Sequence, residues 1–170
     1  MFYHGDRQFL FTGDLEKDGE EKLADKYDFK QVELYKAGHH GSKTSSNNCL
    51  LKEIQPKICV VTCCAGSVEY TNNLQNTFPT QAMLDRIAKY TDKVYVPLVI
   101  DIVQVEGADT PNDTSDDKYK NADQYEMLNG NIVVISAKDG VSVECSNNNT
   151  LLKDTVWFSK YRQMPDAWLN

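Results

Sequence analysis

The sequence is short of histidine, of long apolar runs and of paired Cys-x-x-Cys units, and each shortage excludes a class of protein. The 170 residues include only three histidines, His4, His39 and His40, so one copy of the chain cannot build a site that needs four or more imidazoles. No apolar run approaches the roughly 20 residues of a membrane-spanning helix. We therefore expect no transmembrane segment within these residues.

The cysteines are odd in number and lack the spacing of a zinc site. The five residues are Cys49, Cys59, Cys63, Cys64 and Cys145. An odd number cannot all pair within one chain, and a thiolate zinc site favours paired Cys-x-x-Cys units. Three of the five lie in the apolar stretch 58–64, where a thiol behaves as a small buried hydrophobe. We expect free structural thiols, which suit a reducing compartment.

Composition and charge fit one globular domain with an acidic surface. Hydrophobic residues make up 41% and charged residues 25% of the chain, and 170 residues suffice to bury a single core. The formal net charge of −7 and the pI of about 4.9 argue against a broad basic nucleic-acid face. They leave room for a small nucleic-acid site around a metal.

Strand-like and helix-like segments alternate along the chain, which predicts a layered α/β fold. The strand segments are rich in β-branched and aromatic residues, and the helix segments place apolar residues on one face. The expected strands lie in a hairpin within residues 2–13, at 32–37, 58–63 and 93–97, and in a second hairpin at 131–136 and 141–144. The expected helices are 19–26, 46–54 and 80–90.

The pattern divides the chain into four parts. These are a core at residues 1–97, an acidic insertion loop at 98–128, a closing hairpin at 129–145 and an aromatic tail at 146–170. The loop is expected because seven acidic residues and only two lysines fall between Asp101 and Asp123. Trp157 and Trp168 predict that the tail docks on the core.

Two strand ends carry side chains suited to metal or acid–base chemistry. Asp14 follows a predicted strand and Gly13, which lets the backbone turn sharply. His39 and His40 stand between two glycines, directly after the strand at 32–37. Each junction alone is also compatible with an ordinary turn, so the case for a site rests on finding both together.

The two junctions together resemble the C-terminal half of the metallo-β-lactamase fold. The matching stretches are residues 9–16 and 32–45, with the helix and strand after them and Pro79 at the start of the next helix. Within that superfamily the chain looks most like the hydrolase domain of ComEC-type competence proteins, which are bacterial, and their free-standing relatives. The resemblance implies half of an αββα sandwich, with a mixed sheet and flanking helices.

The resemblance also implies a two-metal hydrolytic site, usually with zinc and sometimes with manganese. Asp14 would bridge the two ions and take part in catalysis, and His40 would be the last ligand of the second ion. His39 would lie beside it as a catalytic or substrate-contacting residue, although local sequence does not separate the two histidines. Bound substrate would contact the loop residues Ser42, Lys43 and Thr44.

The chain departs from the family at two places. The family's N-terminal H-x-H-x-D-H run is missing, and Phe78 stands where relatives carry a histidine before the helix-opening proline. The chain is then a fragment of a longer hydrolase, a half-domain completed by a partner chain, or a degenerate relative; the first is favoured. Without the N-terminal half, a sheet face or edge should be exposed. The missing N-terminal half or a second copy of the chain could cover it.

We therefore expect the C-terminal part of a metal-dependent, dizinc hydrolase that acts in its full-length form on phosphodiester bonds, such as those of DNA during uptake. These residues alone are expected to have little or no activity. The alternative is a non-catalytic binding or assembly module on the same half-fold. A calcium loop at 109–117 is a weaker reading, because the glycine and distal glutamate of an EF-hand are missing. The parent's compartment, cytoplasmic or membrane-linked and exported, stays open.

Overall fold

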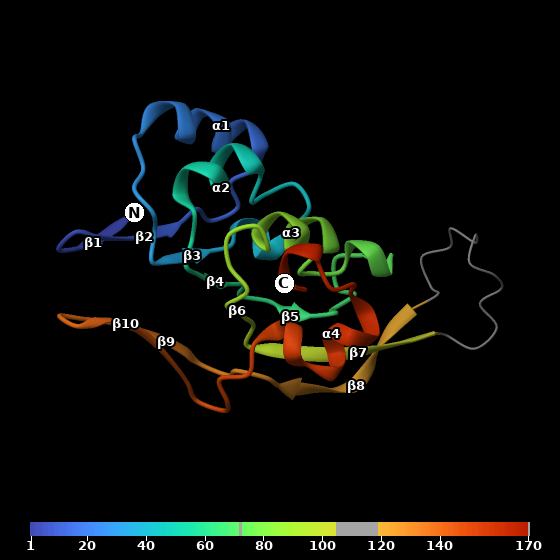
Figure 1. The fold of residues 1–170 in the computed structure, drawn as a ribbon. Helices are drawn as coiled ribbons and strands as arrows, with labels where there is room; N and C mark the ends of the chain where they lie inside the picture. The colour runs from blue at the N-terminus through green and yellow to red at the C-terminus, as the bar shows by residue number, and fades with distance from the viewer. Residues whose placement is uncertain (72, 105–118, 170) are drawn as a thin grey trace.

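The main sheet has five strands in the order β1-β2-β3-β4-β6 (Figure 1). The computed structural model describes residues 1–71, 73–104 and 119–169. β1 is antiparallel to β2, and the pairs from β2 to β6 are parallel. The strands are β1 (Phe2–His4), β2 (Arg7–Phe11), β3 (Leu34–Lys36), β4 (Ile58–Val60) and β6 (Val94–Tyr95). The parallel register brings the carboxyl ends of β2, β3 and β4 to one edge of the sheet.

Three helices cover one face of this sheet, and a strand hairpin covers the other (Figure 1). The helices are α1 (Lys17–Lys26), α2 (Asn48–Ile54) and α3 (Gln81–Ile87). Leu10, Tyr35 and Cys59 face the helices, whereas Phe9 and Leu34 face the hairpin. The alternation of side chains along each strand produces these two apolar faces. The fold is mixed α/β, as expected.

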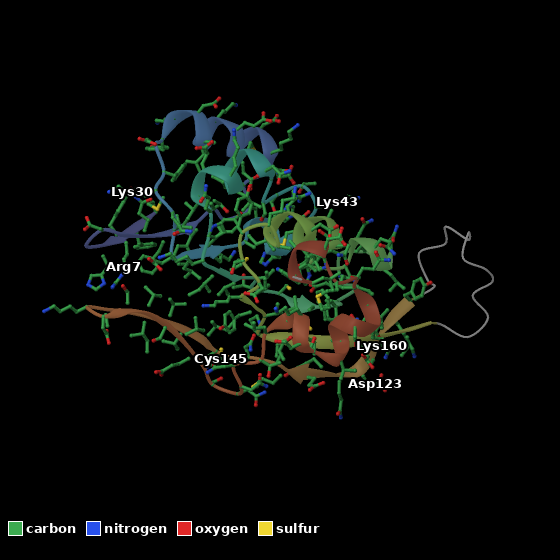
Figure 2. All side chains as sticks on the ribbon, in the orientation of Figure 1. Arg7, Lys30, Lys43, Asp123, Cys145 and Lys160 are labelled. Atoms are coloured by element: carbon green, nitrogen blue, oxygen red, sulfur yellow. The ribbon has the colours of Figure 1, made fainter. Side chains whose placement is uncertain are left out.

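The hairpin consists of β9 (Ile132–Ala137) and β10 (Gly140–Cys145), which pair only with each other among the described strands. Arg7 of β2 connects the turn between β9 and β10 to the main sheet, because its guanidinium donates to the carbonyls of Ala137 and Lys138 (Figure 2). His4 adds a contact of 2.8 Å between its Nδ1 and the Ser136 hydroxyl. His4 thus lies on an edge strand and contacts the hairpin, not the other histidines.

Part of the stretch expected to be an acidic loop forms strands instead. β7 (Leu98–Gln104) pairs parallel with β5 (Cys64–Ala65) and antiparallel with β8 (Tyr119–Met127). The apolar side chains of Val99 and Ile102 are buried, and this burial stabilises β7. β8 is polar and exposed because it lies at the sheet edge, which hides its strand pattern. The calcium-loop reading at 109–117 lies outside the described residues.

The C-terminal tail packs on the core through its aromatic side chains. α4 (Val156–Tyr161) buries Trp157, whose indole Nε1 donates to the Ile100 carbonyl at 3.1 Å. Trp168 Nε1 donates to the Thr91 carbonyl at 3.0 Å. The remaining short helical turns are Gly38–Gly41, Leu74–Asn76, Leu152–Asp154 and Asp166–Trp168. In the part of the chain that is described, no helix has the length and apolar character to cross a membrane.

Candidate functional site

The loops after β2 and β3 meet at the carboxyl edge of the main sheet. Phe11 and Lys36, the last residues of these neighbouring parallel strands, are paired in register. The His39 N–H donates to the Gly13 carbonyl at 2.9 Å and ties the two loops together. Gly13 has a φ of 59°, a conformation that favours glycine. The two junctions singled out in the sequence therefore form one site.

Both histidines have left-handed backbone conformations. The φ angles are 45° for His39 and 53° for His40, in a turn that residues other than glycine rarely adopt. At Gly41, which follows with a φ of 84°, a Cβ would lie 2.9 Å from side-chain carbons of both Pro79 and Val61. Strained backbone of this kind persists only where its surroundings enforce it, and it is concentrated at functional sites.

His40 is the histidine that lies next to Asp14. Its Nδ1 is 2.7 Å from the Thr62 carbonyl oxygen, which only accepts hydrogen bonds, so Nδ1 carries the proton. In the neutral ring this leaves a lone pair on Nε2, which lies 4.0 Å from Asp14 Oδ1. A tetrahedral zinc ion sets two such ligand atoms about 3.4 Å apart, so the two side chains would have to approach by roughly 0.6 Å to bind one ion. Fixing the tautomer through the second ring nitrogen is how proteins prepare histidine to bind a metal.

His39 has a different partner, Glu16. Its Nδ1 lies 3.2 Å from Glu16 Oε1, and the Thr44 hydroxyl donates to the same carboxylate oxygen at 2.9 Å. The His39 Nδ1 also lies 3.5 Å from the Thr44 hydroxyl oxygen, so Glu16, Thr44 and His39 form one polar cluster beside the Asp14–His40 pair. Glu16 was not identified as a site residue from the sequence. Its position two residues after Asp14, in the same loop, could have indicated it.

The three loop residues expected to contact substrate have unequal access. The Ser42 side chain is buried, and its hydroxyl contacts Thr44 Oγ1 at 3.0 Å and accepts from the Thr44 N–H. Lys43 is exposed and donates from Nζ to Asn76 Oδ1 at 2.9 Å (Figure 2). A pocket of about 250 Å³ adjoins Lys43, Phe78 and Ser42. Of the three, only Lys43 presents a charge to this pocket.

A buried carboxylate holds one side of the loop that follows the histidines. Glu20 of α1 is fully buried. Its carboxylate accepts from the backbone N–H groups of Ser46 and Asn47 at 2.6 and 2.7 Å, and from Asn47 Nδ2 at 2.8 Å. Asn47 precedes α2 but makes no side-chain cap, so Glu20 supplies acceptors at this helix start.

Arg86 of α3 holds the other side of the same loop. Its guanidinium donates to the carbonyls of Ser46, Lys43 and Ser45 at 2.8, 3.0 and 2.8 Å. Burial lowers the pKa of Arg86, and the negative charge of Glu20 opposes that shift. Glu20 accepts from backbone N–H groups of this loop and Arg86 donates to its carbonyls. Together they hold the chain that follows the histidines in place.

The side chains that could bind a metal do not form a complete site in the described part of the chain. Among the residues that the structure describes, no group of three or more His, Cys, Asp or Glu side chains is arranged to hold a metal ion. Asp14 and His40 are therefore two donors where zinc usually takes four ligands. The cysteines do not add to them: all five are free, and burial raises the pKa of Cys59 to about 12, which keeps its thiol protonated.

About half of the chain is similar to bacterial competence and recombination proteins. The ComE operon protein 3 of Bacillus subtilis is 30% identical over 90 residues, which cover 53% of this chain and 11% of that protein. Competence protein ComA of Neisseria gonorrhoeae is 36% identical over 93 residues, covering 53% and 12%. Recombination protein 2 of Haemophilus influenzae is 29% identical over 90 residues, covering 53% and 10%.

The matched region spans about a tenth of the length of each of these relatives. No family model and no solved structure matches the chain. The similarities support a relationship to competence proteins.

Proposed function

We propose that this chain is the C-terminal part of a metal-dependent hydrolase of the metallo-β-lactamase type, which cleaves phosphodiester bonds in a bacterial protein of DNA uptake. The observation that carries the proposal is the pair Asp14 and His40, with the His40 tautomer set by the Thr62 carbonyl. The similarity to competence proteins supports the link to DNA.

The residues of the chain would divide the work between ligation and proton transfer. Asp14 supplies an anionic ligand and His40 a neutral one through Nε2, so both suit zinc or manganese. Such ions, when bound, lower the pKa of a coordinated water and polarise the phosphoryl group. His39, whose Nδ1 lies 3.2 Å from Glu16, would contact the substrate or take part in proton transfer.

The remaining ligands would come from outside these residues. An apolar cavity of about 480 Å³ lies between the main sheet and β9, lined by residues that include Phe2, Phe11 and Ile132. Phe2 and Phe11 are exposed there, and β1, which pairs with β2, is an edge strand of the main sheet. A missing N-terminal half of the domain, or a second copy of the chain, would cover this surface and complete the site.

The proposal is tested by titrating the purified chain with Zn²⁺, and separately with Mn²⁺, in a calorimeter. We expect weak binding of one ion that is lost in both Asp14→Asn and His40→Gln. The control variant His4→Gln changes a histidine outside the site and should bind as the parent does. Binding that is unchanged in the two site variants, or lost in the control alone, would contradict the assignment.

A non-catalytic binding module is the second candidate. The Phe78 ring lies 6.1 Å from the His39 ring, so an apolar group borders the site. A longer form of the protein that carries the missing half discriminates the two. Metal-dependent hydrolysis of a phosphodiester, lost in Asp14→Asn, supports the hydrolase, whereas full metal occupancy without hydrolysis supports the binding module.

A further inference from the structure

Three rings form a ladder that leads away from the metal-site residues. The ring centroids of His39 and Phe78 are 6.1 Å apart with 55° between the ring planes, and those of Phe78 and Tyr70 are 6.1 Å apart with 30° between the planes. Tyr70 at the outer end is 72% exposed. A tyrosine this exposed gains little from burial, so its open face is available to a further flat ring.

A cation lies beside the ladder. Lys43, Tyr70, Asn76 and Phe78 border the same pocket of about 250 Å³. An ammonium group has three protons to donate, and the contact with Asn76 Oδ1 uses one of them. Lys43 can therefore donate to an anionic oxygen at the pocket while Asn76 holds its side chain in place.

We propose that Tyr70, Phe78 and Lys43 form a base-stacking subsite for single-stranded nucleic acid next to the Asp14–His40 site; this rests on the proposed function. A nucleotide joins a flat aromatic base to a phosphate, which matches an open ring face beside an ammonium. Only an unpaired base presents its face for stacking on protein aromatics, so the subsite takes single strands rather than duplex.

The phenylalanine at position 78 fits this use. Its apolar ring neighbours both His39 and Tyr70, with a centroid distance of 6.1 Å in each case. A base stacked on Tyr70 would extend the ladder by one ring and bring its phosphate toward Lys43. The net charge of −7 opposes nucleic-acid binding, so the affinity should be modest and should fall with salt.

The test measures fluorescence anisotropy of a labelled oligothymidylate with the whole chain, in EDTA and at low ionic strength. An abasic strand of the same length carries the same phosphates without bases. We expect the base-containing strand to bind more tightly, and Tyr70→Leu to weaken its binding roughly 5- to 150-fold while the abasic strand is unaffected. Tyr70→Phe should bind as the parent, and so should Tyr125→Leu, which alters an equally open tyrosine on β8.

Lys43→Gln provides the second arm, because a phosphate contact does not depend on the base. This variant should weaken the binding of both strands by a similar factor and reduce the salt dependence of binding. Equal affinity for the two strands, no binding of either, or unchanged affinity in Tyr70→Leu would overturn the subsite. Because EDTA removes metals, this assay measures binding without hydrolysis. The base-stacking subsite and the metal-dependent hydrolase can therefore be refuted separately.

Discussion

The Nε2 atom of His40 lies 4.0 Å from Asp14 Oδ1, while the other ring nitrogen of His40 is held 2.7 Å from the Thr62 carbonyl. These three residues follow β2, β3 and β4, so the register of the parallel sheet brings them together. Buried Glu20 and half-buried Arg86 hold the loop that follows the histidines from its two sides. Substitutions of Glu20 and Arg86 therefore test the stability of the loop, whereas metal titration tests Asp14 and His40.

Glu20→Gln should destabilise the fold by about 1–3 kcal/mol, because an amide has one acceptor oxygen and leaves a buried N–H group without its partner. The measurement is the urea midpoint, with the slope used to check that unfolding stays two-state. Glu21→Gln is the matched control: this neighbour on α1 is exposed and makes only a 3.7 Å ion pair with Lys17, so its effect should stay within about 0.5 kcal/mol. Equal effects of the two variants would mean that the Glu20 bonds contribute nothing.

Arg86→Lys should also lose stability, because an ammonium cannot reach the three carbonyls that the guanidinium fork contacts. We expect a loss of about 1–3 kcal/mol by chemical denaturation. Exposed Lys89 on the same segment serves as the control in Lys89→Arg, which should be neutral. Full stability of Arg86→Lys would show that charge alone holds the loop.

Gly41→Ala should lower the free energy of unfolding more than Gly5→Ala does. Both glycines have positive φ, so both variants lose about 1–2 kcal/mol from the backbone. At Gly41 the new methyl group would also lie 2.9 Å from Pro79 and Val61, whereas at Gly5 nothing lies within 4 Å. The clash should add about 1–3 kcal/mol and weaken metal binding at His40. Similar melting curves for the two variants would argue against a tightly packed turn at Gly41.

Stability should fall at alkaline pH. Burial raises the pKa of Cys59 from 9.0, and that of Tyr35 from 10.0, to about 12. The folded state then holds protons that the unfolded state has lost, so the free energy of unfolding decreases as pH rises from about 9 toward 12. Urea midpoints across this range in reductant should show the decline, and Cys59→Ala should flatten it. A variant that declines as steeply as the parent contradicts the assignment to Cys59.

Local patterns predicted the strand ends that carry Asp14, His39 and His40, because a glycine next to a polar side chain after an apolar run is visible in sequence. They could not predict Glu20, since its burial depends on α1 packing against a loop more than twenty residues away. The Thr62 contact uses a backbone carbonyl, which leaves no trace in side-chain identity.

The missed strands have a similar explanation. The pairing of β8 is made by the backbone at a sheet edge, so polar side chains such as Asn121 and Glu126 are tolerated there and the segment looks like a loop. The choice between His39 and His40 likewise depends on the folded turn Gly38–Gly41, which places His40 next to Asp14 and His39 next to Glu16.

The most direct test of the central claim is a long-range ¹⁵N–¹H correlation spectrum of the imidazoles, recorded while Zn²⁺ is added. Only three histidines contribute, so each ring can be assigned by substitution. The account predicts that His40 carries its proton on Nδ1 and that its Nε2 signal moves with zinc, while His4 does not respond. A proton on Nε2 of His40, or a zinc response confined to His4, would contradict it.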